Sequence, residues 1–146
     1  MKKPLDYALS NYGHKVDEDP LWMDYYKANP KCHIDDKVID WSAVFMCWCL
    51  DSANFKRPYF FSSAAFVPYS SQLINELDTG HIFIMSIDED SKNNLKASKG
   101  CSVGFVIGMH PRGKGYYVLK LNQENTVDLM LVNTMDIFCS TVPAQR

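Results

Sequence analysis

The sequence predicts an α+β domain in which helices come first and an antiparallel sheet follows. Segments typical of helices, bounded by proline, asparagine or glycine, fill the first half of the chain. The second half holds short apolar runs separated by turn-rich segments, as strands do. Helices followed by strands favour an α+β architecture over alternating βαβ units. Because 146 residues suit one hydrophobic core, we expect a single domain over residues 1–146.

Two short helices are expected near the N-terminus. The first covers residues 4–12, with a proline near its start and a glycine after its end. The second covers residues 21–28, between an acidic turn and the pair Asn29-Pro30. A polar segment at 31–37 is expected to be a loop.

The central element is an apolar segment at residues 40–53. Its apolar side chains point in nearly every direction around a helix axis rather than along one stripe, and a helix of this kind is usually buried. Asp40 or the residue before it can serve as the N-cap. We therefore expect a buried central helix that packs on the sheet.

Five strands are expected in the second half of the chain. They cover residues 81–85, 103–109, 116–121, 127–131 and 137–142. Between the central helix and the first strand, residues 56–69 are aromatic and irregular, and residues 70–77 are expected to form a short helix. A polar loop is expected at 88–100.

Composition and charge argue against several classes of protein. The 15 basic and 17 acidic residues give a net charge of -2, without a long run of one sign, so no nucleic-acid partner is expected. The longest apolar run, 43–50, is far shorter than the ~20 residues of a membrane span. The N-terminus lacks the apolar stretch of a secretory signal, so we expect a soluble chain made in the cytoplasm. Export by a route that needs no such signal stays open.

The five cysteines do not have the spacing of a metal site. Zinc sites use paired Cys-x-x-Cys or Cys/His spacings, whereas Cys47 and Cys49 are separated by one residue and Cys32-His33 has no second pair beside it. We expect buried thiols, no metal and no cofactor.

Three segments resemble motifs of the papain-like cell-wall amidases and peptidases, specifically the CHAP and NlpC-like type found in bacteria and phages. The WCSAFVNWCL helix of that family is similar to residues 41–50, which read WSAVFMCWCL. Its GHVGF strand is similar to residues 101–105, CSVGF, and its GNQ segment to residues 121–123, LNQ. Residues 8–9, 25–28 and 79–80 also fit the family. The resemblance therefore spans nearly the whole chain, and it implies a papain-like fold.

The resemblance also implies the positions of the site. The family nucleophile falls on Ser42, its general base on Ser102 and its orienting residue on Asn122, and only Asn122 keeps the family identity. A hydroxyl nucleophile needs a base within hydrogen-bond reach, and serine does not accept a proton at neutral pH as imidazole does. We therefore expect a pseudoenzyme, an inactive amidase-like domain whose cleft binds a peptidoglycan stem peptide or a protein partner.

The other thiols are expected to lie away from the nucleophile position. Cys49 lies about 10 Å deeper along the helix than Ser42, and Cys47 points roughly 140° away from it. Cys101 precedes Ser102 on a strand, so its side chain is expected on the other side of the sheet. An irregular start of that strand would bring Cys101 near the site.

Two other functions stay open. An active peptidoglycan amidase or endopeptidase, such as a phage lysin or an antibacterial effector, requires that Ser42 be an engineered replacement of cysteine or that a base relocate. His14 and His33 lie in segments that could fold over the cleft, whereas His81 and His110 are expected farther away. A structural or assembly protein that reuses the fold is the third possibility, because fold alone does not decide function. The oligomeric state is not predicted.

Overall fold

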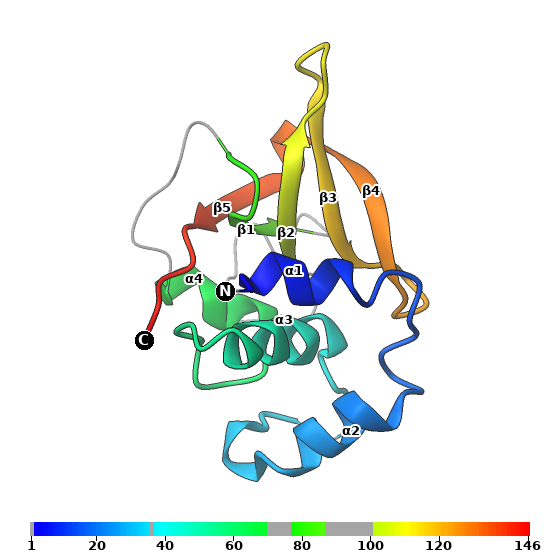
Figure 1. The fold of residues 1–146 in the computed structure, drawn as a ribbon, viewed down its shortest axis with the longest axis vertical. Coiled ribbons are helices and arrows are strands. Elements are labelled where there is room, and N and C mark those ends of the chain that lie inside the picture. Colours follow the sequence, from blue (N-terminus) through cyan, green and yellow to red (C-terminus); the bar gives the residue numbers. More distant parts are fainter. Residues whose placement is uncertain (1, 36, 70–76, 87–100) are drawn as a thin grey trace.

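Helices precede a five-stranded antiparallel sheet in the computed structural model, which describes residues 2–35, 37–69, 77–86 and 101–146 (Figure 1). The prediction of an α+β architecture is confirmed. The helices are α1 (Pro4–Leu9), α2 (Pro20–Lys27), α3 (Trp41–Ser52) and α4 (Phe66–Tyr69). The strands are β1 (Ile82–Ser86), β2 (Cys101–Met109), β3 (Gly115–Leu121), β4 (Val127–Asn133) and β5 (Ile137–Thr141).

Helix α3 is the central helix that the sequence predicts. Asp40 is its N-cap, and the carboxylate accepts a hydrogen bond from the backbone amide of Ala43 at 3.1 Å. Most of its side chains are buried, including the whole run 43–47. It packs against α1, α2, β2 and β3. From α2, Trp22 contributes a fully buried ring that lies 5.5 Å from the ring of Trp48.

The sheet has the strand order β4-β3-β2-β1-β5, and every neighbouring pair is antiparallel. Side chains alternate between its two faces. One face contributes Val103 and Phe105 of β2 to the large core that contains α3. The other face contributes Phe83 and Val106 to a second, smaller core. A strand residue can therefore reach α3 only if its side chain lies on the first of these two faces.

Several element boundaries differ from the prediction. Helix α1 ends at Leu9 rather than at 12, because Ser10 Oγ and Asn11 Nδ2 donate hydrogen bonds to backbone carbonyls four residues earlier and the chain then turns. Strand β2 begins at Cys101, two residues earlier than expected. The helix expected at 70–77 and the loop expected at 88–100 lie almost wholly outside the described residues.

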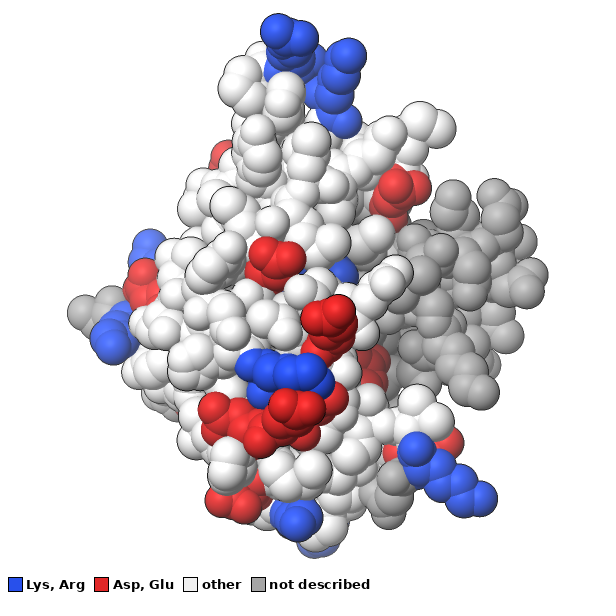
Figure 2. Space-filling model, turned by 90° about the vertical axis from the view of Figure 1, so that its right-hand side faces the viewer, with Lys and Arg blue, Asp and Glu red and all other residues white. Residues whose placement is uncertain are grey.

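Charges of both signs lie beside one another on the face shown in Figure 2. Lys15, for example, forms ion pairs with Asp17 at 3.0 Å and Glu18 at 3.2 Å. These exposed pairs contribute little to stability. Within the described ranges, no helix has both the length and the apolar character that a membrane span requires.

Candidate functional site

The candidate site is a cleft where the N-terminus of α3 meets the start of β2. Its volume is about 220 Å³. We call it the α3 cleft, and it is lined by Asp35, Val38, Ile39, Asp40, Trp41, Ser42, Cys101 and Asn125. The nucleophile position of the family resemblance, Ser42, is therefore at a cleft, in the first turn of a buried helix.

The carboxylate of Asp40 accepts hydrogen bonds from backbone amides at and near this helix N-terminus. The donors are the amides of Ala43 at 3.1 Å and Ser63 at 2.7 Å. Burial raises the pKa of Asp40 above its ordinary value, and the hydrogen bonds from the amides oppose part of that shift. Helix N-termini favour negative charge, and here the protein supplies that charge itself. The amides that hold Asp40 are therefore not available to an oxyanion of a reacting peptide.

Cys101, rather than Ser102, lines the cleft together with Ser42. Cys101 is the first residue of β2, is 8% exposed and lines the cleft. Ser102 lies opposite Met85 on β1, and Met85 packs against the second core, on the face away from α3. The family resemblance places the general base at Ser102, but the residue of β2 that lines the cleft with Ser42 is Cys101, one position earlier. The physical reason is the strand pleat, because a shift of one residue moves a side chain to the other face.

Asn122 shapes a turn rather than the cleft. Its side-chain oxygen accepts hydrogen bonds from the amides of Glu124 at 2.9 Å and Thr126 at 3.1 Å, between β3 and β4. The residue of that turn that lines the cleft is Asn125, which has a positive φ of 60° and donates to Asp17 at 3.4 Å. Sequence reasoning missed Asn125. An asparagine in a turn between two predicted strands was the available signal, since asparagine tolerates positive φ.

The four histidines all lie outside the lining of the α3 cleft. His33 comes nearest along the chain, but its ring stacks on Tyr26 with 3.6 Å between centroids, and its Nε2 is 2.7 Å from the Tyr26 carbonyl oxygen. His14, His81 and His110 belong to other segments. The lining described above also holds no lysine or arginine.

The residues that line the α3 cleft favour hydrogen bonding over nucleophilic chemistry. A thiol becomes reactive beside a base or a cation, whereas the other ionisable side chains of the described lining are the carboxyl groups of Asp35 and Asp40. Cys47 and Cys49 are completely buried in α3, and burial raises the pKa of both thiols far above the ordinary value. Among the described residues there is no group of three or more side chains that could hold a metal ion.

No family model, curated protein or solved structure matches this chain. The interpretation of the α3 cleft therefore depends on its own geometry, together with the motif resemblance in the sequence.

Proposed function

We propose that this chain is a catalytically inactive, amidase-like domain of papain-like fold that binds a peptide in the α3 cleft. The observation that carries the proposal is that Ser42 and Cys101 line one cleft at the N-terminus of a buried helix, and that the described lining of this cleft contains no imidazole. A papain-like hydrolase needs a thiolate at the first of these positions and a histidine opposite it.

The state of the helix N-terminus supports an inactive domain. Oxyanion stabilisation by preorganised amides is usually among the largest contributions to amide hydrolysis. Here, Asp40 accepts the hydrogen bonds of the amides of Ala43 and Ser63. A negative charge that develops beside Asp40 would be repelled rather than stabilised, which disfavours acyl transfer.

The remaining groups of the cleft suit peptide binding. The Ser42 hydroxyl and the Asn125 side-chain amide can donate to and accept from a peptide backbone, and Val38, Ile39 and Trp41 provide apolar contact. A peptidoglycan stem peptide is the ligand that the family resemblance favours. An extended segment of a protein partner would use the same groups.

The position of Cys101 defines the competing function, an active hydrolase in which this thiol is the nucleophile. Incubation of the purified protein with peptidoglycan, followed by mass spectrometry of the soluble fraction, distinguishes the two. We expect no released fragments. Release that disappears in Cys101→Ala would establish the competing function and refute the proposal.

Binding is tested by co-sedimentation with insoluble peptidoglycan. We expect the wild-type protein to sediment with the polymer and Ser42→Trp, which fills the cleft, to stay in solution. Ser10→Trp, at the exposed end of α1, is the matched control and should sediment like the wild type. The ligand assignment is wrong if the wild type does not sediment or if both variants lose binding equally.

A further inference from the structure

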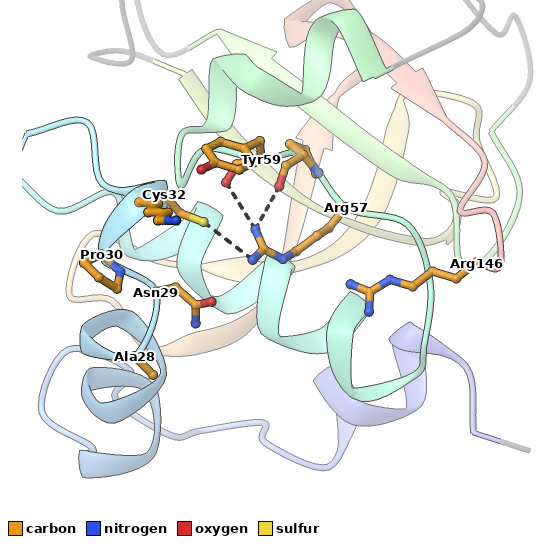
Figure 3. A pocket seen from close by; sticks show the side chains of 9 residues that line it. Ala28, Asn29, Pro30, Cys32, Arg57, Tyr59 and Arg146 are labelled. Carbon is orange, nitrogen blue, oxygen red and sulfur yellow. Dashed lines mark hydrogen bonds between the residues drawn. The ribbon is translucent and has the colours of Figure 1, made fainter.

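A second cavity, of about 550 Å³, opens between the end of α2 and the segment that follows α3 (Figure 3). We call it the arginine pocket. Its cationic lining consists of Lys31, Arg57 and Arg146, and its apolar lining includes Pro30, Pro58 and Tyr59. It shares no described lining residue with the α3 cleft. A role for this pocket is therefore independent of the proposed function.

The guanidinium of Arg57 is held in a fixed orientation. Its side chain is only 13% exposed. Nε donates to Asp51 at 2.8 Å, and Nη1 donates to the carbonyl oxygens of Pro58 at 2.9 Å and Tyr59 at 3.3 Å. Nη2 lies 3.7 Å from the sulfur of Cys32. The guanidinium also interacts with the buried thiol of Cys47. These contacts fix the positive charge of Arg57 beside the pocket that it lines.

A single carboxylate, Asp51, pairs with both Arg57 and Arg146 in the part of the chain that the structure describes. Asp51 also accepts a hydrogen bond of 2.5 Å from the hydroxyl of Tyr25. Burial, and then this hydrogen bond, raise the pKa of Tyr25 far above its ordinary value, so the phenol stays protonated and keeps donating. Asp51 therefore pairs with two guanidiniums at once, and Lys31 adds a third cationic side chain to the described lining, which includes no Asp or Glu.

Arg146 reaches the pocket from a segment far away in the sequence. Its backbone amide donates to the Asn54 carbonyl at 3.2 Å, and the Lys56 amide donates to the Ala144 carbonyl at 2.8 Å. These hydrogen bonds hold the segment beside the end of α3. The guanidinium of Arg146 extends toward that of Arg57 in Figure 3, and only one of its nitrogens bonds Asp51. Its other N–H groups can meet a ligand.

We propose that the arginine pocket binds an oxyanion, a carboxylate or a phosphate, carried by a ligand whose apolar part contacts Pro58 and Tyr59. Guanidinium groups match the planar geometry of carboxylate and phosphate oxygens and form the stronger, charge-assisted hydrogen bonds. The cationic side chains of the described lining, which has no acidic side chain, favour an anion over a neutral ligand. The exposed ring of Tyr59 provides an apolar surface beside the cations.

The test is a titration of the full chain, at constant ionic strength, with inorganic phosphate in one arm and phenylacetate in the other. Binding is followed by the NMR shifts of the Asn29 and Tyr59 amides and of the Arg57 Nε–H group. We expect saturable shifts at these groups in at least one arm. Tighter binding of phosphate assigns a phosphate site, and tighter binding of phenylacetate assigns a carboxylate with an apolar body.

Two variants make the titration specific. Arg146→Gln, at a half-exposed side chain, leaves Asp51 paired with Arg57 and Tyr25, so the fold should persist while affinity falls about tenfold. Arg112→Gln, in the exposed turn between β2 and β3, is the matched control and should bind like the wild type. Absence of saturable shifts in both arms would overturn the proposal, as would equal affinity of Arg146→Gln and the wild type or equal weakening by the two variants.

Discussion

Asp40 is the residue on which the character of the α3 cleft depends most. It caps α3, it joins the helix to the segment around Ser63, and it lines the cleft beside Ser42. The cap stabilises the helix, whereas the partial burial of a carboxylate is unfavourable. One side chain thus links the stability of the helix to the charge that a ligand or a reacting group would meet.

Two substitutions of Asp40 separate these effects. Asp40→Ala removes the acceptor and leaves the amides of Ala43 and Ser63 without their partner, so we expect a loss of about 2 kcal/mol in the free energy of unfolding. Asp40→Asn keeps one acceptor oxygen and removes the charge, but an NH2 group replaces the oxygen that accepts from the second amide. We therefore expect a smaller loss than for Asp40→Ala. Urea unfolding of both variants beside the wild type measures the difference.

The raised pKa of Asp40 also predicts a pH dependence. Above the ordinary value of 3.8, the native state holds the Asp40 proton more tightly than the unfolded state does, so this group contributes less stability as the pH rises through that window. Asp40→Asn lacks this loss. Its stability relative to the wild type should therefore increase from about pH 4 upward and then level off. A constant difference across that range, or a decrease, would contradict the burial of this carboxylate.

At the scale of elements, α3 and β2 show what the sequence could and could not predict. The apolar pattern of α3 has no polar side, and that observation predicted its burial. The N-cap was predicted separately, at Asp40 or the residue before it, and the structure places it at Asp40. The strand β2 was also predicted, but which of its side chains point toward α3 was not. The resemblance aligned the strand motif with Ser102, and the pleat turns Cys101 to the cleft instead. The face that each side chain of β2 takes depends on the register with β1 and β3, and this register is a tertiary property.

The orienting position also differs from the expectation, since the resemblance placed it at Asn122 and the cleft is lined by Asn125. Both Asn122 and Asn125 lie in the turn between β3 and β4, and sequence alone does not tell which side chain closes the turn and which lines the cleft. The hydrogen bonds decide, because Asn122 accepts from two amides of its own turn.

Strand β2 contains two glycines that test its packing. A Cβ at Gly104 would lie 2.7 Å from both the Leu119 carbonyl oxygen and Lys120 Cβ, so Gly104→Ala should lower the free energy of unfolding by about 3 kcal/mol through overpacking. At Gly108, nothing lies within 4 Å of such a Cβ. Gly108→Ala is the matched control and should have little effect or stabilise slightly. Thermal unfolding of the two variants is the measurement, and equal effects would contradict the pairing of β2 with β3.

For the molecule as a whole, segments distant in the sequence surround α3. Trp22 packs on Phe45 and Trp48, and hydrogen bonds join residues 144–146 to residues 54–56. The sequence predicted the helix but not these partners, because contacts between distant segments leave no periodic pattern in the sequence. The same packing surrounds both the α3 cleft and the arginine pocket, which share no described lining residue.

The tertiary arrangement of α3 and β2 is the most direct test of the account, since it determines which side chain faces Ser42. Ser42→Cys introduces a thiol at the helix N-terminus, and a short bifunctional thiol reagent followed by peptide mass spectrometry identifies its partner. We expect a cross-link from position 42 to Cys101. In a second variant that combines Ser42→Cys, Cys101→Ala and Ser102→Cys, we expect no cross-link between positions 42 and 102. A cross-link in the second variant and none in the first would place Ser102 in the cleft and contradict the structure proposed for this site.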